Sequence, residues 1–180
     1  MRIGRPTRAA TVAIVATLVA GCSQQIPQGG ALATPSDHGW ETQQSVGAVF
    51  TDGFETLDVV SGPVQVIDVR FEGGDPGLEL VGYELVPPPR RYATIQLLPG
   101  FPPRSRGLPK ARVKPGESLD TDPNGQGYEL LLGIKVVQEG RWVRTGVTVE
   151  YRSGGREYVQ TLPAELVVCT RDFGKSRGRC

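Results

Sequence analysis

Short apolar runs alternate with turn residues along most of this chain. From Val46 onward, segments rich in valine, leucine, isoleucine and tyrosine recur about every ten residues, separated by Gly, Pro, Asp or Asn. No stretch longer than about one turn places apolar residues at helical spacing. Runs of this length and spacing are typical of strands that pair with their neighbours in sequence. The pattern therefore predicts an all-β domain, an antiparallel β-sandwich of roughly 7–9 strands.

The clearest local prediction is a hairpin in the sequence GVTVEYRSGGREYVQTL. Val147, Val149 and Tyr151 alternate with polar residues, which is the period of a half-buried strand. Gly154 and Gly155 can form a two-residue turn. This turn would place three pairs of residues opposite each other: Ser153 and Arg156, Arg152 and Glu157, Tyr151 and Tyr158. One charge pair and one aromatic pair thus support the register.

The segment YELLLGIKVV, just before this hairpin, repeats the alternation. Its apolar face would carry Leu130, Leu132, Ile134 and Val136. Joined to the hairpin through Glu139-Gly140, it is expected to complete a three-stranded meander. This part of the chain resembles the C-terminal half of immunoglobulin-like domains in bacterial surface proteins, although no upstream cysteine is placed for their inter-sheet disulfide. The resemblance implies an immunoglobulin-like type of sandwich.

The N-terminal segment has the pattern of a targeting signal. Three arginines precede an apolar stretch from Ala9 to Ala20, which is shorter than the roughly 20 residues of a membrane-spanning helix. The stretch ends in Val19-Ala20-Gly21-Cys22, which resembles the lipobox of bacterial lipoproteins; the composition suggests an actinobacterial one. The resemblance implies cleavage after Gly21 and attachment of diacylglycerol to the thiol of Cys22, with acyl chains such as palmitate as the membrane anchor.

The chain is therefore expected to have three parts. Residues 1–21 are the signal peptide, residues 22–45 a lipidated flexible tether rich in Gln, Gly, Pro and Ser, and residues 46–180 the sandwich domain. We expect the protein at the cell membrane, held by lipid on the extracytoplasmic face. His38, the only histidine, falls in the expected tether.

Outside the cytoplasm, the two remaining cysteines can oxidise. Cys169 ends the last apolar run and Cys180 is the last residue of the sequence. We expect a disulfide between them, which would close the C-terminal tail against the domain and add roughly 3 kcal/mol in the chain-entropy model. The alternative is two free thiols.

Positive charge is concentrated in one proline-rich segment, whereas most of the rest of the mature chain is acidic. Between Pro87 and Lys114 there is no acidic residue, and prolines disfavour both helix and sheet. Its basic residues are Arg90, Arg91, Arg104, Arg106, Lys110, Arg112 and Lys114. With Phe101 and Leu108 expected to be exposed, this segment is a surface for an anionic partner or an edge whose charges discourage pairing with other strands. The anionic partner would be an envelope protein, an anionic wall polymer or lipid headgroups.

Residues for chemistry are few. Asp120, Asp122 and Asn124 match the first half of an EF-hand calcium loop, but Leu131 occupies the position of the bidentate glutamate, which favours a Pro-Asn-Gly turn. Zinc and copper sites lack enough Cys and His. We expect no cofactor, no nucleic-acid partner and no catalysis by the protein, which we expect to be a monomer in solution.

The sequence therefore predicts a binding or envelope-accessory module. Two alternatives stay open. One is an interaction subunit of an envelope complex that docks through the basic segment, and the other is a hydrolase that uses a pair of carboxylates in a cleft.

Overall fold

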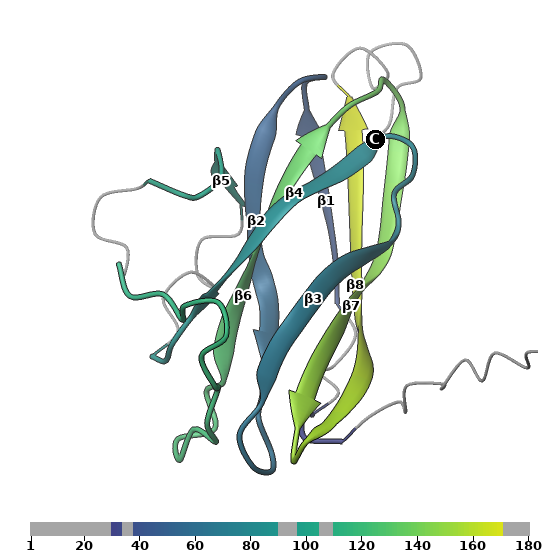
Figure 1. Cartoon of the computed structure of the whole chain (residues 1–180). Coiled ribbons are helices and arrows are strands. Elements are labelled where there is room, and N and C mark those ends of the chain that lie inside the picture. The colour runs from purple at the N-terminus through teal and green to yellow at the C-terminus, as the bar shows by residue number, and fades with distance from the viewer. Residues whose placement is uncertain (1–29, 34–37, 90–96, 105–109, 171–180) are drawn as a thin grey trace, which may run out of the picture.

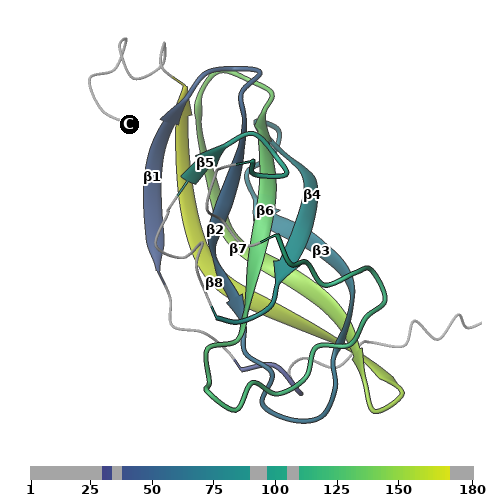
Figure 2. The same cartoon turned by 90° about the vertical axis from the view of Figure 1, so that its left-hand side faces the viewer.

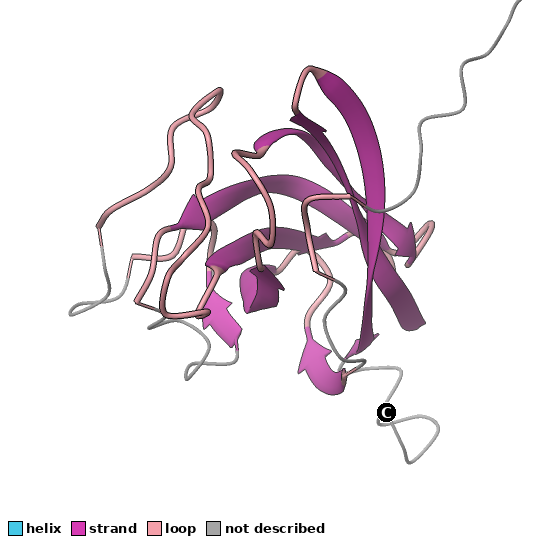
Figure 3. Ribbon diagram, turned by 90° about the horizontal axis from the view of Figure 1, so that it is seen from below, coloured by secondary structure: helices cyan, strands magenta, loops and turns pink. Residues whose placement is uncertain are grey.

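The computed structural model describes residues 30–33, 38–89, 97–104 and 110–170. All regular elements of these residues are strands (Figure 3). Their bounds are β1 Gly39–Gln44, β2 Val49–Leu57, β3 Gln65–Gly73, β4 Leu78–Val86, β5 Leu97–Pro99, β6 Tyr128–Val136, β7 Arg141–Ser153 and β8 Arg156–Thr170. Within the described residues there is no helix long and apolar enough to cross a membrane.

The strands form two four-stranded sheets (Figure 1). One sheet has the order β1-β8-β7-β3 and the other the order β4-β6-β2-β5. Neighbouring strands are antiparallel except for β1 and β8, which are parallel. The prediction of an all-β chain with two mainly antiparallel sheets is thus confirmed.

The main core lies between the two sheets. The predicted inner face of β6 is confirmed, because Leu130, Leu132, Ile134 and Val136 are completely buried in it. Val147 and other core residues of β7 meet them from the opposite sheet. A small second cluster lies on the outer face of β6. Among the described residues it consists of Leu131, Val86 and Leu98. Most of β6 is therefore buried on both faces.

The predicted hairpin between β7 and β8 is confirmed in its register. Ser153 lies opposite Arg156, Arg152 opposite Glu157, and Tyr151 opposite Tyr158. Gly154 and Gly155 have φ angles of 56° and 75°, which are favourable for glycine in a two-residue turn. Arg152 Nη2 is 2.6 Å from Glu157 Oε1, and the two tyrosine rings stack with centroids 5.5 Å apart.

The predicted three-stranded meander is wrong. β6 does not pair with β7 but lies between β4 and β2 in the other sheet, so residues 137–140 cross from one sheet to the other. The physical reason is the burial of β6 on both faces, which suits a central strand with partners on both sides. Proximity in sequence favoured the wrong neighbour.

The predicted boundary between tether and domain at residue 46 is also wrong. β1 forms six register pairs with β8, from Gly39 opposite Glu165 to Gln44 opposite Thr170 (Figure 2). Upstream, the Ala31 N–H donates to the Tyr151 hydroxyl at 3.1 Å. β1 is an edge strand whose main chain pairs with β8 and whose single large apolar side chain, Trp40, packs against the core. With one such residue in six, the strand leaves little apolar pattern in the sequence. Residues 1–29, with the expected signal peptide and Cys22, lie outside the described residues.

Candidate functional site

A loop covers part of the open lateral side of the sandwich, between its edge strands β3 and β4. β3 and β4 are the edge strands of their sheets on this side. Residues 110–119, which we call the strap, connect them. The Val113 N–H donates to the Leu85 carbonyl on β4 at 2.9 Å. At its other end, Leu119 and Val64 exchange two main-chain hydrogen bonds of 2.7 and 2.9 Å just before β3.

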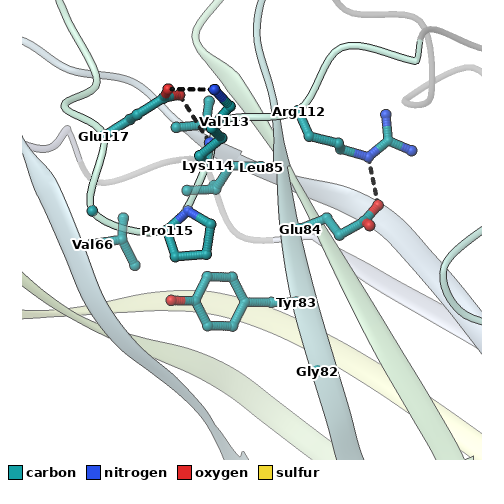
Figure 4. A pocket seen from close by; sticks show the side chains of 11 residues that line it. Val66, Gly82, Tyr83, Glu84, Leu85, Arg112, Val113, Lys114, Pro115 and Glu117 are labelled. Carbon is teal, nitrogen blue, oxygen red and sulfur yellow. Dashed lines mark hydrogen bonds and ion pairs between the residues drawn. The ribbon is translucent and has the colours of Figure 1, made fainter.

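A pocket of about 540 Å³ lies between these edge strands and the strap. This volume is within the range of small-molecule sites, roughly 300–1,000 Å³. Its walls are mainly apolar and are formed by Val66 on β3, Leu85 on β4, and Val113 and Pro115 on the strap. In Figure 4 the Tyr83 ring extends from β4 across the pocket towards Val66 and Pro115.

Tyr83 supplies a polar group in this apolar surrounding. Burial, with a smaller contribution from the negative charge of Asp68, raises the pKa of Tyr83 above its ordinary value. The phenol therefore stays protonated at neutral pH and can both donate and accept a hydrogen bond. Large apolar walls with a hydrogen-bonding group among them can bind and orient a ligand of mainly apolar character.

Two ion pairs lie around the pocket. Arg112 Nε is 2.5 Å from Glu84 Oε2, and in Figure 4 this pair lies on the side of β4 opposite to Tyr83. Lys114 Nζ is 3.9 Å from Glu117 Oε1, and the Lys114 N–H donates to Glu117 Oε2 at 2.9 Å. The Lys114 side chain is 82% exposed. Its ammonium group is therefore open to solvent at the edge of the pocket.

The predicted basic surface is only partly brought together. Arg112 and Lys114 line the pocket, where acidic residues from outside the basic segment pair with them. Arg104 and Lys110 are exposed. Arg90, Arg91, Arg106 and Leu108 lie outside the described residues.

The prediction that Phe101 is exposed is wrong. Phe101 is half-buried, and its ring lies directly over Gly133 on β6 and beside Gly82 on β4. A Cβ atom at Gly133 would overlap this ring. The two glycines thus form a flat seat for the ring, which sequence spacing did not reveal because Phe101 and Gly133 are far apart in the chain.

Sequence analysis missed a buried ionic cluster between the sheets. Arg144 on β7 lies with its Nη1 2.7 Å from Asp52 Oδ2 and its Nη2 2.6 Å from Glu55 Oε1, both on β2. All three side chains are completely buried. The Ala164 carbonyl also accepts hydrogen bonds from Arg144 at 3.3 Å.

Irregular pairing makes this cluster possible. Residues three apart face opposite sides of a regular strand. The pairing of β2 with β6 shifts between Asp52 and Glu55, so both carboxylates reach the same guanidinium. A second shift, between Arg144 and Gly146, accompanies it on β7.

The cluster extends to His38, which was expected in the tether but lies beside the domain. Its Nε2 is 3.2 Å from Glu55 Oε2, and its carbonyl accepts a hydrogen bond from the Glu165 N–H at 2.9 Å. Burial raises the pKa of Asp52, outweighing the opposite effect of Arg144, and the nearby Glu55 charge raises it further. The cluster joins the two sheets, since Arg144 belongs to β7 and its two acidic partners to β2. Because Asp52 and Glu55 are completely buried, their carboxylates are closed to substrates.

The loop of the calcium candidates uses its oxygens internally. Asp122 Oδ1 accepts the Asn124 N–H at 3.1 Å, and Oδ2 accepts the Gln126 N–H at 2.7 Å. These hydrogen bonds lower the pKa of Asp122. The Asp120 N–H donates to the Tyr128 hydroxyl at 3.1 Å. Over the described ranges, no three His, Cys, Asp or Glu side chains gather in a group able to hold a metal ion.

Of the predicted disulfide, only one half falls in the described part of the chain. Cys169 is completely buried near the end of β8, opposite Arg141 on β7. Cys180 lies outside the described residues, so the bond between them stays a prediction.

Comparison with known proteins adds no assignment. No family model, curated protein or solved structure matches the chain. The strapped pocket is thus the candidate site on its own geometry.

Proposed function

We propose that this protein is a binding module that holds a mainly apolar ligand in the strapped pocket, without catalysis of its own. The observation that carries the proposal is the pocket of about 540 Å³ with its apolar walls and its one protonated phenol. The strap adds a reason for specificity, because two of its attachment points, Val113 and Leu119, fix its position over the open side of the sandwich.

The positions and partners of four acidic side chains favour a binding function over hydrolysis. Asp52 and Glu55 are sealed in the core. Glu84 and Glu117 line the pocket, but each is paired with a cation, Arg112 or Lys114. A glycosidase needs one carboxylic acid free to protonate the leaving group and a second free to assist water or attack. These pairs fit a role in holding the strap in place.

Two further parts of the proposal concern the environment of the protein. We infer a lipid anchor at Cys22 on the extracytoplasmic face, supported by the lipobox-like sequence. We also infer an immunoglobulin-like type of sandwich, supported by the two packed sheets. Labelling of producing cells with palmitate should mark the protein and leave a Cys22→Ser variant unmarked. Equal labelling of both would remove the anchor from the proposal.

The pocket itself can be tested with anilinonaphthalene sulfonate, whose fluorescence rises in apolar sites. We expect saturable binding by the full chain. A Val66→Phe variant fills the pocket from β3 and should weaken binding about tenfold or more, since it removes space for the probe. The matched control is Val60→Phe, at a residue that is 57% exposed and does not line the pocket. Equal affinities of the two variants would refute the pocket as the binding site.

A second candidate function is docking to an envelope protein through the basic segment. The exposure of Arg104 and Lys110 favours it, because these side chains are open to a partner. Cross-linking on intact cells should lose one partner when both residues are changed to glutamate. Retention of every cross-linked partner would exclude this alternative.

A further inference from the structure

We propose that the ligand is an amphiphile with a long acyl chain and an anionic head group, which binds along the open side of the sandwich between β3 and β4. This inference rests on the proposed function and names its ligand class. The head group would lie at Lys114, and the acyl chain would run through the strapped pocket and on towards the loop that joins β3 to β4.

A second pocket lies between the same two strands, β3 and β4. It has a volume of about 480 Å³ and is lined by Phe71 on β3 and by Leu78 and Leu80 on β4. Phe71 is five residues beyond Val66, the β3 residue of the strapped pocket, a distance of about 16 Å along a strand. The two pockets thus lie in line, and a ligand that used both would have to be long and narrow.

Two exposed apolar side chains lie on the edge strands between the residues that line the two pockets. Ile67 and Val81 are 43% and 41% exposed, and both are among the large hydrophobic residues that the described chain leaves open to water. Each is the extra residue of a bulge in its edge strand. An apolar chain lying between the pockets would cover them.

The bulges also decide between two kinds of long ligand. An extended peptide would bind by continuing the hydrogen-bond ladder of an edge strand. Both edges are interrupted here, between Val66 and Asp68 on β3 and between Leu80 and Gly82 on β4. A bulge disrupts such a ladder. An acyl chain needs no ladder, so the geometry favours it.

The two pockets differ in the charged residues that line them. At the strapped pocket, Lys114 presents an 82% exposed ammonium group, and exposed Lys110 belongs to the same strap. The far pocket is lined by two acidic residues, Asp75 and Glu79, of which Glu79 pairs with Lys135 at 3.6 Å. Its one cation among the lining residues, Arg70, pairs with Glu150 at 2.5 Å. An anionic head group would therefore meet the solvent-exposed ammonium of Lys114 at the strap, and the exposed carboxylate of Asp75 at the far end.

Competition with the fluorescent probe tests this ligand class. The full chain carrying Cys22→Ser, which has no thiol for acylation, is titrated with octanoate, dodecanoate and hexadecanoate below their micelle concentrations. We expect affinity to rise roughly tenfold or more from octanoate to hexadecanoate, because each added methylene is buried along the path. Affinity that does not depend on chain length would overturn the inference.

Substitutions locate the chain and the head group. Val81→Asp and, independently, Ile67→Asp should each weaken hexadecanoate binding about tenfold, whereas Val60→Asp, at another exposed apolar residue, should not. Lys114→Glu should weaken binding of dodecanoate but not of an uncharged monoacylglycerol. Its control is Arg156→Glu, at an exposed residue that lines neither pocket. Equal effects of site and control variants would refute the proposed position.

Two sources share this chemistry, a free fatty acid and an anionic phospholipid. Tighter binding of dodecanoate than of dodecyl phosphate would support the first source, and the reverse order the second. If the fluorescent probe binds and Val66→Phe blocks it, yet no alkyl acid competes, the acyl ligand is wrong while the binding pocket stands. If the probe does not bind at all, the proposed function itself fails.

Discussion

Arg144 and Glu55 face each other across the sandwich, with Nη2 2.6 Å from Oε1 and both side chains shut off from water. One residue belongs to β7 and the other to β2, so the contact joins the two sheets. Phe71 packs against the same guanidinium, whose central carbon lies 5.6 Å from the centroid of its ring. The chain thus places a charged network where an apolar contact would be expected.

Loss of Arg144 should destabilise the fold strongly. Arg144→Met leaves Asp52 and Glu55 buried without their cation, which typically costs about 3–5 kcal/mol. Arg152→Met is the control, because Arg152 is about half exposed in its pair with Glu157 and should cost no more than about 1 kcal/mol. Urea unfolding measures both variants, and similar free energies of unfolding would contradict the prediction.

Asp52 should make stability depend on pH in a defined direction. Burial raises the pKa of Asp52 in the folded state, so folding favours its protonated form. Its contribution to the free energy of unfolding is therefore full below the ordinary value of 3.8 and is lost as pH rises through the folded pKa. Asp52→Asn cannot titrate, so the stability of the wild type relative to this variant should fall as pH rises. A difference that grows with pH would contradict this.

Local features of the fold were predictable from the sequence, and non-local ones were not. The turn at Gly154-Gly155 and the inner face around Leu132 follow from short-range patterns, and both are confirmed. The strap was missed because Val113 pairs with Leu85, far upstream and across a proline-rich segment.

The buried cluster was missed for a different physical reason. Arg144 and Val147 are three residues apart, which in a regular strand places them on opposite faces. Both are completely buried, because the pairing of β7 is irregular between Arg144 and Gly146. A bulge changes the alternation locally, and no periodic pattern reports where it falls.

Any side chain at position 133 should lower the stability of the fold as long as Phe101 is present. Gly133→Ala pushes the ring from its seat and should cost roughly 1–3 kcal/mol. In a Phe101→Ala background the same change should cost clearly less, which gives a coupling of about 0.5–3 kcal/mol in a double-mutant cycle. Free energies of unfolding of the four proteins measure it. Strict additivity would mean that the ring does not occupy the glycine seat.

Calcium should leave the thermal midpoint unchanged. Both oxygens of Asp122 already accept main-chain N–H groups of their own loop, from Asn124 and Gln126. A cation would have to displace these bonds. Differential scanning fluorimetry with millimolar calcium chloride measures the midpoint, with magnesium chloride at equal ionic strength as the control. A saturable rise with calcium alone would revive the calcium site.

The parallel pairing of β1 with β8 sets the mechanical behaviour of the domain. A pull between the chain segments that precede β1 and follow β8 acts along both strands in opposite senses. The register pairs from Gly39 with Glu165 to Gln44 with Thr170 then resist it together, in shear. An antiparallel pair pulled from one end would instead open one bond at a time. Tension applied between these two segments therefore loads the β1–β8 pairs in shear, the direction in which they resist best.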